Sequence, residues 1–193
     1  MGISELLVTL KQIKTEKHIS AFKGQKIAVD IYVWIYKSFY SYARLKFTGS
    51  FEEDKAKIDN DQSYLYYLKN RLNLLLENQI TPLIVFDSAR PKIKAETIGS
   101  KRAKSKTVKF EGNMKKYTSK LISTIEINKE KIDAIIQLLE KMNIQYIFAP
   151  KEADAQLAYL SKMHIVDAII TEDSDQLVYV TLQIIFFNLL GLK

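Results

Sequence analysis

Acidic residues recur at or near the ends of predicted strands in this 193-residue chain. The residues that share this position are Asp30, Asp87, Glu152, Asp154, Asp173 and Asp175. In an open parallel sheet the carboxyl ends of the strands meet at one edge, and ligands bind in the crevice beyond it. We therefore expect the six carboxylates to gather at a single edge of a sheet.

Carboxylates crowded at one edge raise one another's pKa, so they need a strong counter-charge to stay ionised together. Mg²⁺ and Mn²⁺ accept such oxygen ligands, and two ions about 4 Å apart can activate water and clamp a phosphate. A single aspartate after a strand is more simply a helix cap or a turn residue. Six at one edge favour a site for two divalent cations.

Apolar runs alternate with helical patterns, which is typical of an α/β protein with a mostly parallel central sheet flanked by helices. The predicted strands are 26–33, 82–87, 144–149, 168–171 and 183–190. The predicted helices are 61–79, 128–143, 152–163 and an aromatic segment after Asp30. Most of the aromatic side chains in that segment should be core. Tyr36 is the one that could present its ring for stacking on a base, although the sequence alone favours core packing for it as well.

Positive charge is concentrated between the second and third predicted strands. The segment Lys92–Lys120 has nine lysines and Arg102 against two glutamates, so it alone exceeds the net charge of the whole chain, which is +7. A lysine run by itself is usually a solvated loop. Because this one directly follows Asp87, it could overhang the acidic edge and attract a phosphate backbone.

Composition excludes several classes of site. The chain has no cysteine, which excludes a disulfide scaffold, a thiolate zinc site, an iron–sulfur cluster and a cysteine nucleophile. No export signal is recognisable, because Glu5 precedes any apolar run. The apolar segment 176–192 is interrupted and shorter than a membrane helix requires. We therefore expect a protein that does not enter a membrane.

Five ordered motifs resemble the structure-specific 5′ nuclease superfamily, which includes flap endonuclease, exonuclease 1 and the excision-repair endonuclease. They are MGI at the start of the chain, FKGQKIAVD, PLIVFD, EADAQLAYL and AIITEDSD, and the resemblance spans residues 1–177. EADAQLAYL and IITEDSD look closer to the exonuclease 1 branch than to flap endonuclease. The resemblance implies a PIN-like 5′ nuclease fold with a basic helical arch and a metal-dependent 5′ to 3′ exonuclease acting in DNA repair.

The resemblance also implies roles for individual residues. The six carboxylates would bind two Mg²⁺ ions, which Mn²⁺ could replace. Lys94 matches the catalytic lysine of the arch. The arch arginine falls on Lys101 when counted without a gap and on Arg102 after one insertion, and the bidentate guanidinium favours Arg102. The expected DNA contacts are Gly2, Tyr36, Lys101 and Lys104.

By the same resemblance, residues 1–193 form one nuclease domain. It would divide into an N-terminal region (1–90), a basic arch segment (91–127) and an internal region (128–193). Ser88 stands where the family usually has glycine, which we expect to perturb the turn after Asp87. The family's seventh carboxylate and its helix–two-turn–helix region have no counterpart in this sequence, so the resemblance implies a truncated nuclease.

The implied partner is DNA with a 5′ end, a nick or a flap, and the implied location is the nucleus. The sequence names no protein partner. A flap endonuclease is the alternative within the same class. The alternative from another class is a catalytically inactive DNA-binding fragment.

Overall fold

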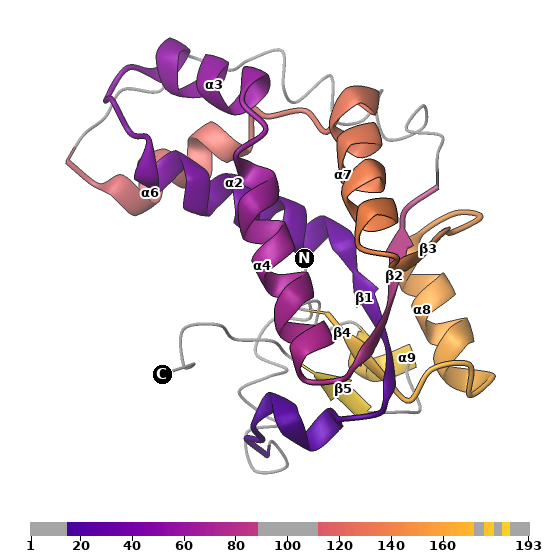
Figure 1. The fold of residues 1–193 in the computed structure, drawn as a ribbon. Coiled ribbons are helices and arrows are strands. Elements are labelled where there is room, and N and C mark those ends of the chain that lie inside the picture. The colour runs from indigo at the N-terminus through magenta and orange to yellow at the C-terminus, as the bar shows by residue number, and fades with distance from the viewer. Residues whose placement is uncertain (1–14, 89–111, 172–175, 180–182, 186–193) are drawn as a thin grey trace. The chain divides into compact units, whose positions relative to one another are not determined.

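The computed structural model describes residues 15–88, 112–171, 176–179 and 183–185 (Figure 1). The chain divides into two compact units. The sheet unit comprises Met1–Val33, Leu72–Ala89 and Ile144–Lys193, and the helical unit comprises Trp34–Arg71 and Arg90–Asn143. The border between them falls inside two helices, α2 (Ile31–Leu45) and α4 (Tyr64–Glu77).

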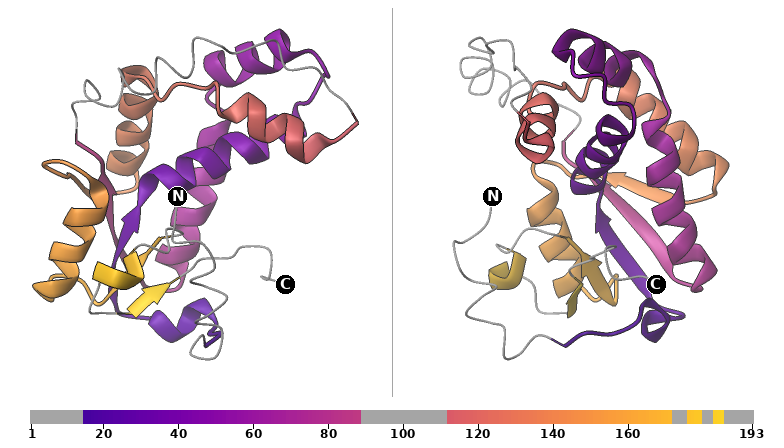
Figure 2. Two further views of the ribbon diagram at one scale, coloured as in Figure 1. Left: turned by 180° about the vertical axis from the view of Figure 1, so that it is seen from behind. Right: turned by 90° about the vertical axis from the view of Figure 1, so that its left-hand side faces the viewer.

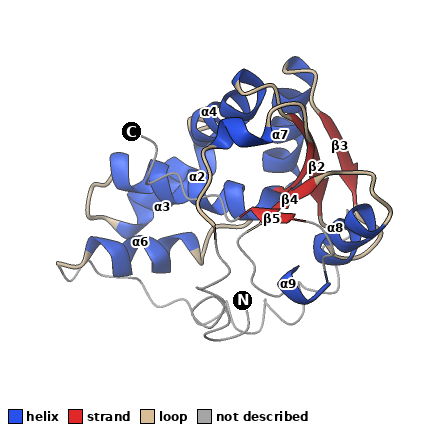
Figure 3. Cartoon of the chain, turned by 90° about the horizontal axis from the view of Figure 1, so that it is seen from below, coloured by secondary structure: helices blue, strands red, loops and turns tan. Residues whose placement is uncertain are grey.

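The sheet unit contains a five-stranded, all-parallel sheet with the strand order β3-β2-β1-β4-β5 (Figure 3, red). The strands are β1 (Lys26–Asp30), β2 (Thr81–Phe86), β3 (Gln145–Phe148), β4 (Ala168–Ile170) and β5 (Gln183–Ile185). This unit also holds the short helices η2 (Ile19–Phe22) and α9 (Gln176–Tyr179). The predicted α/β class with a parallel sheet is confirmed.

Both faces of the central strands are buried, as a parallel sheet requires. Alternate residues of β1 and β2 form one fully buried face: Ile27, Val29, Ile84 and Phe86. The residues between them face the helix α8 (Ala153–Lys162), which lies along β1, β2 and β4 (Figure 2). Ala28, Val85 and Ile169 pack there against Leu157 and Leu160 of α8. A continuous apolar layer thus fixes α8 to one face of the sheet.

The helical unit contains α3 (Phe51–Asn60), α6 (Met114–Ile122), α7 (Lys129–Lys141) and most of α2 and α4. Its core is aromatic, because Phe39 of α2 meets Tyr64 of α4 edge-to-face with ring centroids 4.8 Å apart. The guanidinium of Arg71 lies 5.5 Å from the ring centroid of Trp34, within the range of a cation–π contact. Burial raises the pKa of Tyr64 to about 12, as expected for a phenol inside such a core.

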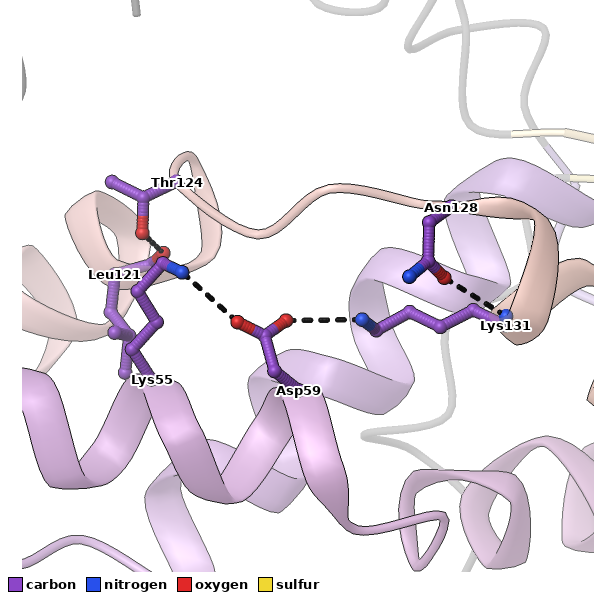
Figure 4. A network of polar contacts seen from close by, with 6 residues as sticks. All are labelled: Lys55, Asp59, Leu121, Thr124, Asn128 and Lys131. Carbon is purple, nitrogen blue, oxygen red and sulfur yellow. Dashed lines mark hydrogen bonds and ion pairs between the residues drawn. The ribbon is translucent and has the colours of Figure 1, made fainter.

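Helix α3 is joined to its neighbours by two of its aspartates. Asp59 forms ion pairs of 3.0 Å with Lys55 of the same helix and with Lys131 of α7 (Figure 4). Asp54 is 3% exposed and accepts hydrogen bonds from the Thr48 N–H, the Thr48 hydroxyl and the Tyr117 hydroxyl of α6. Side-chain contacts therefore tie α3 to both α6 and α7.

The positions of the predicted strands and helices agree with the structure more closely than their lengths do. All five predicted strands exist, and the helices predicted at 61–79, 128–143 and 152–163 are α4, α7 and α8. The first strand was expected to reach Val33 but ends at Asp30, since α2 begins at Ile31. The β-branched residues Ile31 and Val33 favour strands in isolation, and the tertiary context overrides that preference. Helices α3 and α6 were not predicted, and residues 186–190 of the last predicted strand lie outside the described residues.

Within the described residues, no helix has both the length and the apolar character needed to cross a bilayer.

Candidate active site

The sheet register places Asp30 and Asp87 on the same face of the sheet. Asp30 ends β1 and is aligned with Val85 of β2, and Asp87 follows Val85 by two residues. Side chains two residues apart in extended chain point to the same side. That side is the one covered by α8, because Val85 itself packs against this helix.

Three carboxylates meet the start of α8. Glu152 is the N-cap residue of the helix, and Asp154 lies in its first turn. Asp87 reaches the same place from the end of β2, where its Oδ1 accepts a 2.7 Å hydrogen bond from the Ala153 N–H. The positive end of the helix dipole favours negative charge here. The strand end and the helix start thus bring Asp87, Glu152 and Asp154 to the same end of α8.

Asp30 is anchored in a similar way at the start of α2. Its Oδ1 accepts a 3.1 Å hydrogen bond from the Tyr32 N–H, and the residue is 8% exposed. Strand β1 ends at Asp30 and helix α2 begins at the next residue. The Asp30 side chain stabilises this change, because it satisfies one of the amides that a helix start leaves without a partner.

Two main-chain hydrogen bonds fix the backbone around Asp87. The Ala149 N–H donates to the Phe86 carbonyl over 2.8 Å, and the Ser88 N–H donates to the Lys151 carbonyl over 2.9 Å. Ser88 was expected to perturb this turn. Among the described residues other than glycine, positive φ occurs at Gln79, Asn143 and His164. Ser88 is not one of them, so the backbone at Ser88 does not require glycine, and the residues from 89 onward in this turn lie outside the described residues.

The fourth strand ends at the same edge. Ile170 of β4 pairs with Val29, one residue before Asp30, and Thr171 is buried directly after the strand. The predicted ligands Asp173 and Asp175 follow, and they lie outside the described residues. The predicted DNA contacts Gly2, Lys101 and Lys104 and the predicted catalytic cations Lys94 and Arg102 also lie outside them.

The described carboxylates supply suitable donors for a divalent cation but not a whole ligand set. Asp30, Asp87, Glu152 and Asp154 offer the oxygen ligands that Mg²⁺ and Mn²⁺ take. Within residues 15–88, 112–171, 176–179 and 183–185, no three acidic or histidine side chains form a group that could hold a metal ion. The donor chemistry fits the predicted cations, and the predicted set is completed by Asp173 and Asp175.

Tyr36 differs from the other aromatic residues of α2. Trp34, Phe39 and Tyr42 are almost fully buried, whereas Tyr36 is 37% exposed. Its ring meets the buried ring of Phe39 edge-to-face, with 6.5 Å between the centroids. Tyr32 and Tyr40 are partly buried, so half of the aromatic residues of this segment are core, where most were expected to be. The ring of Tyr36, the predicted stacking residue, is accessible and rests against Phe39.

Part of the basic segment is described as helix α6. Its lysines Lys115, Lys116 and Lys120 are exposed, while Tyr117 and Leu121 are buried. The cations of this helix therefore face solvent, and its apolar residues fix it to the helical unit.

The hydrogen bond from the Ala153 N–H of α8 to Asp87 was not predicted from the sequence. A signal for it existed, because the N-cap position of α8 holds Glu152 and not one of the short polar residues that usually cap helices. A helix start of this kind needs an acceptor from elsewhere in the chain.

Two family models match the chain. The XPG N-terminal domain matches residues 1–108, and the XPG I-region matches residues 143–191.

Curated relatives cover almost the whole chain. Exonuclease 1 of Arabidopsis thaliana is 34% identical and covers 96% of this chain, which spans 25% of the relative. Exodeoxyribonuclease 1 of Schizosaccharomyces pombe is 33% identical over 96% of this chain and 32% of the relative. The DNA damage-inducible protein DIN7 of Saccharomyces cerevisiae is 33% identical over 93% of this chain and 41% of the relative. The chain thus spans between a quarter and about two fifths of the length of these relatives.

Solved structures share the fold. The catalytic core of Rad2 in complex with DNA substrate superposes with a TM-score of 0.66 at 25% identity, over 97% of this chain and 52% of that chain. Flap endonuclease-1 from Methanococcus jannaschii superposes with a TM-score of 0.58 at 26% identity, over 86% of this chain and 53% of that chain.

Proposed function

The chain belongs to the XPG family of the 5′ nuclease superfamily, and we propose that it hydrolyses DNA phosphodiesters near a 5′ end as an exonuclease 1-type enzyme. The observation that carries this proposal is the placement of Asp30, Asp87, Glu152 and Asp154 at the carboxyl edge of a parallel sheet. Ligands of open α/β sheets bind at that edge.

The acidic edge would hold two Mg²⁺ ions, for which Mn²⁺ could substitute. The residues in this role are Asp30, Asp87, Glu152, Asp154, Asp173 and Asp175. When bound, such ions activate water and neutralise the charge that develops on a phosphate. The carboxylates would hold the ions in place, and the hydrogen bonds from the Tyr32 and Ala153 N–H groups orient the side chains of Asp30 and Asp87 for this role.

Cations and one aromatic ring would hold the DNA. Lys94 and Arg102 would stabilise charge on the scissile phosphate, with Lys101 as the alternative to Arg102. Gly2 and Lys104 would contact the backbone, and the exposed ring of Tyr36 would stack on a base. DNA binding is supported by the Rad2 catalytic core, whose structure contains a DNA substrate.

The repair role and the nuclear location belong to the same proposal. The repair role is supported by the names of the relatives, which include exonuclease 1 and a DNA damage-inducible protein, and the nuclear location follows from that role. The similarity to flap endonuclease-1 keeps 5′-flap cleavage as the alternative within the class.

The test is cleavage of a labelled nicked duplex and a labelled 5′-flap duplex with and without Mg²⁺. Wild type would be compared with Asp173→Ala and with Asp133→Ala, which removes an exposed acid of α7 and the same charge. We expect cleavage by wild type and by Asp133→Ala, with loss in Asp173→Ala or without Mg²⁺. Product lengths separate exonuclease from flap activity. DNA binding by wild type without cleavage would overturn the proposed activity in favour of a DNA-binding role.

A further inference from the structure

The N-terminal cap of helix α8 is provided by Asp87, a residue at the end of strand β2. The side chain of its own N-cap residue, Glu152, makes no capping hydrogen bond. The Ala153 N–H donates instead to Asp87 Oδ1 over 2.7 Å, across 66 positions of sequence. From this geometry we propose that Asp87 is a positioning residue as well as a ligand, and that it fixes where α8 begins.

Three successive contacts support this role. The Phe86 carbonyl accepts from the Ala149 N–H, the Ser88 N–H donates to the Lys151 carbonyl, and Asp87 between them bonds to the start of the helix. The end of β2 is therefore joined to the loop before α8 on both sides of Asp87. The side chain is held at the right distance to cap the helix, because its own backbone cannot shift without breaking these two bonds.

Capping from Asp87 has a consequence for the other acids. Glu152 and Asp154 lie at the N-cap and in the first turn of α8, so their backbone positions follow the position of the helix start. Ala153, Leu157 and Leu160 pack in the apolar layer against the sheet and set the face that the helix buries, whereas the hydrogen bond to Asp87 fixes the first amide of the helix. Asp87 thereby places two further carboxylates at the acidic edge. The ligand roles of Asp87, Glu152 and Asp154 rest on the proposed function, whereas the capping of α8 by Asp87 does not.

Two substitutions at Asp87 distinguish the effect of its charge from the effect of its capping hydrogen bond. Asp87→Asn removes the charge but keeps an oxygen that can accept the Ala153 N–H, whereas Asp87→Ala removes both. The measurement is hydrogen–deuterium exchange of the amides of residues 153–156 in the full chain without metal or DNA. We expect exchange within about twofold of wild type in Asp87→Asn, and about fivefold faster exchange in Asp87→Ala, the factor that a typical capping contact supplies.

Two further variants serve as controls. Asp167 accepts a 2.7 Å hydrogen bond from the Lys26 N–H at the start of β1, so Asp167→Ala breaks a contact of the same kind away from α8. It should leave exchange at residues 153–156 unchanged. Glu152→Ala removes a charge at the positive end of the helix dipole but no capping hydrogen bond, so it should speed exchange less than Asp87→Ala does. Equal exchange in Asp87→Asn and Asp87→Ala, or exchange in Glu152→Ala as fast as in Asp87→Ala, would overturn the proposal.

Binding of Mn²⁺ by calorimetry tests the ligand role of Asp87 separately from the cap. Asp87→Asn keeps an amide oxygen that can still bind a cation, so the ligand role by itself predicts weaker Mn²⁺ binding in Asp87→Ala than in Asp87→Asn. We expect both variants to bind Mn²⁺ more weakly than wild type, and the exchange data, which are taken without metal, decide the cap. Failure of wild type to bind Mn²⁺ would overturn the proposed cation site.

Discussion

Main-chain donors hold Asp30, Asp87 and Asp167 of the sheet unit, whereas mostly side-chain donors hold Asp54 and Asp59 of the helical unit. In the sheet unit, Asp30, Asp87 and Asp167 each accept a hydrogen bond from a main-chain N–H, of Tyr32, Ala153 and Lys26 respectively. In the helical unit, the hydrogen bonds to Asp54 and Asp59 come largely from side chains. Tyr117 and Thr48 donate to Asp54, and Lys55 and Lys131 donate to Asp59.

This difference separates two uses of the same residue type. A main-chain amide orients a carboxylate without cancelling its charge, so the oxygen atoms can still contribute to a cation site. A lysine ammonium cancels the charge, and a phenol hydroxyl consumes an acceptor position inside the core. We propose that Asp30 and Asp87 of the sheet unit serve chemistry, whereas Asp54 and Asp59 of the helical unit serve stability.

The largest effect that would test this division is expected at Asp30. In Asp30→Asn the amide oxygen can still accept the Tyr32 N–H, so we expect the free energy of unfolding to change by less than about 1 kcal/mol. Cleavage of nicked DNA should fall by about a hundredfold or more, because losing a ligand removes several kcal/mol of charge stabilisation. Cleavage kinetics and urea denaturation measure the two effects.

The matched variant is Asp59→Asn in the helical unit, which removes the same charge. Its cleavage rate should stay within about twofold of wild type at 25 °C. If both variants lost cleavage equally, or if Asp30→Asn cleaved normally, the division of roles between the units would be wrong.

How far the sequence could predict the structure also differs between the units. In the sheet unit, apolar runs of strand length indicated all five strands, and the acids after them were placed at one edge because parallel strands end together. In the helical unit, α3 was not recognised. Its sequence FEEDKAKIDN buries Phe51, Asp54 and Ile58, and one aspartate among three buried positions hides the apolar period on which such predictions depend.

The contacts of Asp87 show a second limit. The sequence predicted its place at the end of a strand, where one aspartate alone is usually a cap or a turn residue, and six together favoured metal ligands. In the structure Asp87 is a cap residue, and this contact does not contradict a role as a metal ligand. Capping joins Asp87 to Ala153, and a contact between residues so distant in the chain follows from the sheet register and the packing of α8, which no local pattern contains.

The next largest effect concerns Asp54. Asp54→Ala would leave the Tyr117 hydroxyl and the Thr48 N–H without their acceptor, and Asp54 is 3% exposed. We expect a loss of about 3 kcal/mol in the free energy of unfolding, from a buried charged acceptor with several donors. Tyr117→Phe removes one of these bonds and should cost about 1 kcal/mol. Burial and the bond to Asp54 also raise the pKa of Tyr117, so its hydroxyl stays protonated as a donor.

Urea denaturation measures both changes, with Asp133→Ala as the control on an exposed position of α7. The control should lie within about 0.5 kcal/mol of wild type. A loss in Asp54→Ala no larger than that of Tyr117→Phe would mean that the contacts with Thr48 contribute nothing.

The smallest effect is the acid dependence of stability at Asp59. Burial alone would raise its pKa, but hydrogen bonds and charges from Lys55 and Lys131 outweigh burial and hold the pKa below its ordinary value of 3.8. Ionised Asp59 therefore stabilises the folded state above about pH 4, and this contribution is lost as the pH falls through the lowered pKa. Because the side chain is 30% exposed, we expect less than about 1 kcal/mol. The free energy of unfolding of Asp59→Asn should be lower than that of wild type at pH 7 and converge with it toward pH 3.

Asp133→Asn, which changes the net charge equally, should show no such convergence. A difference between wild type and Asp59→Asn that stayed constant from pH 7 to pH 3 would show that Asp59 acts through its shape and not its charge, and the contrast between the two units would then rest on Asp54 alone.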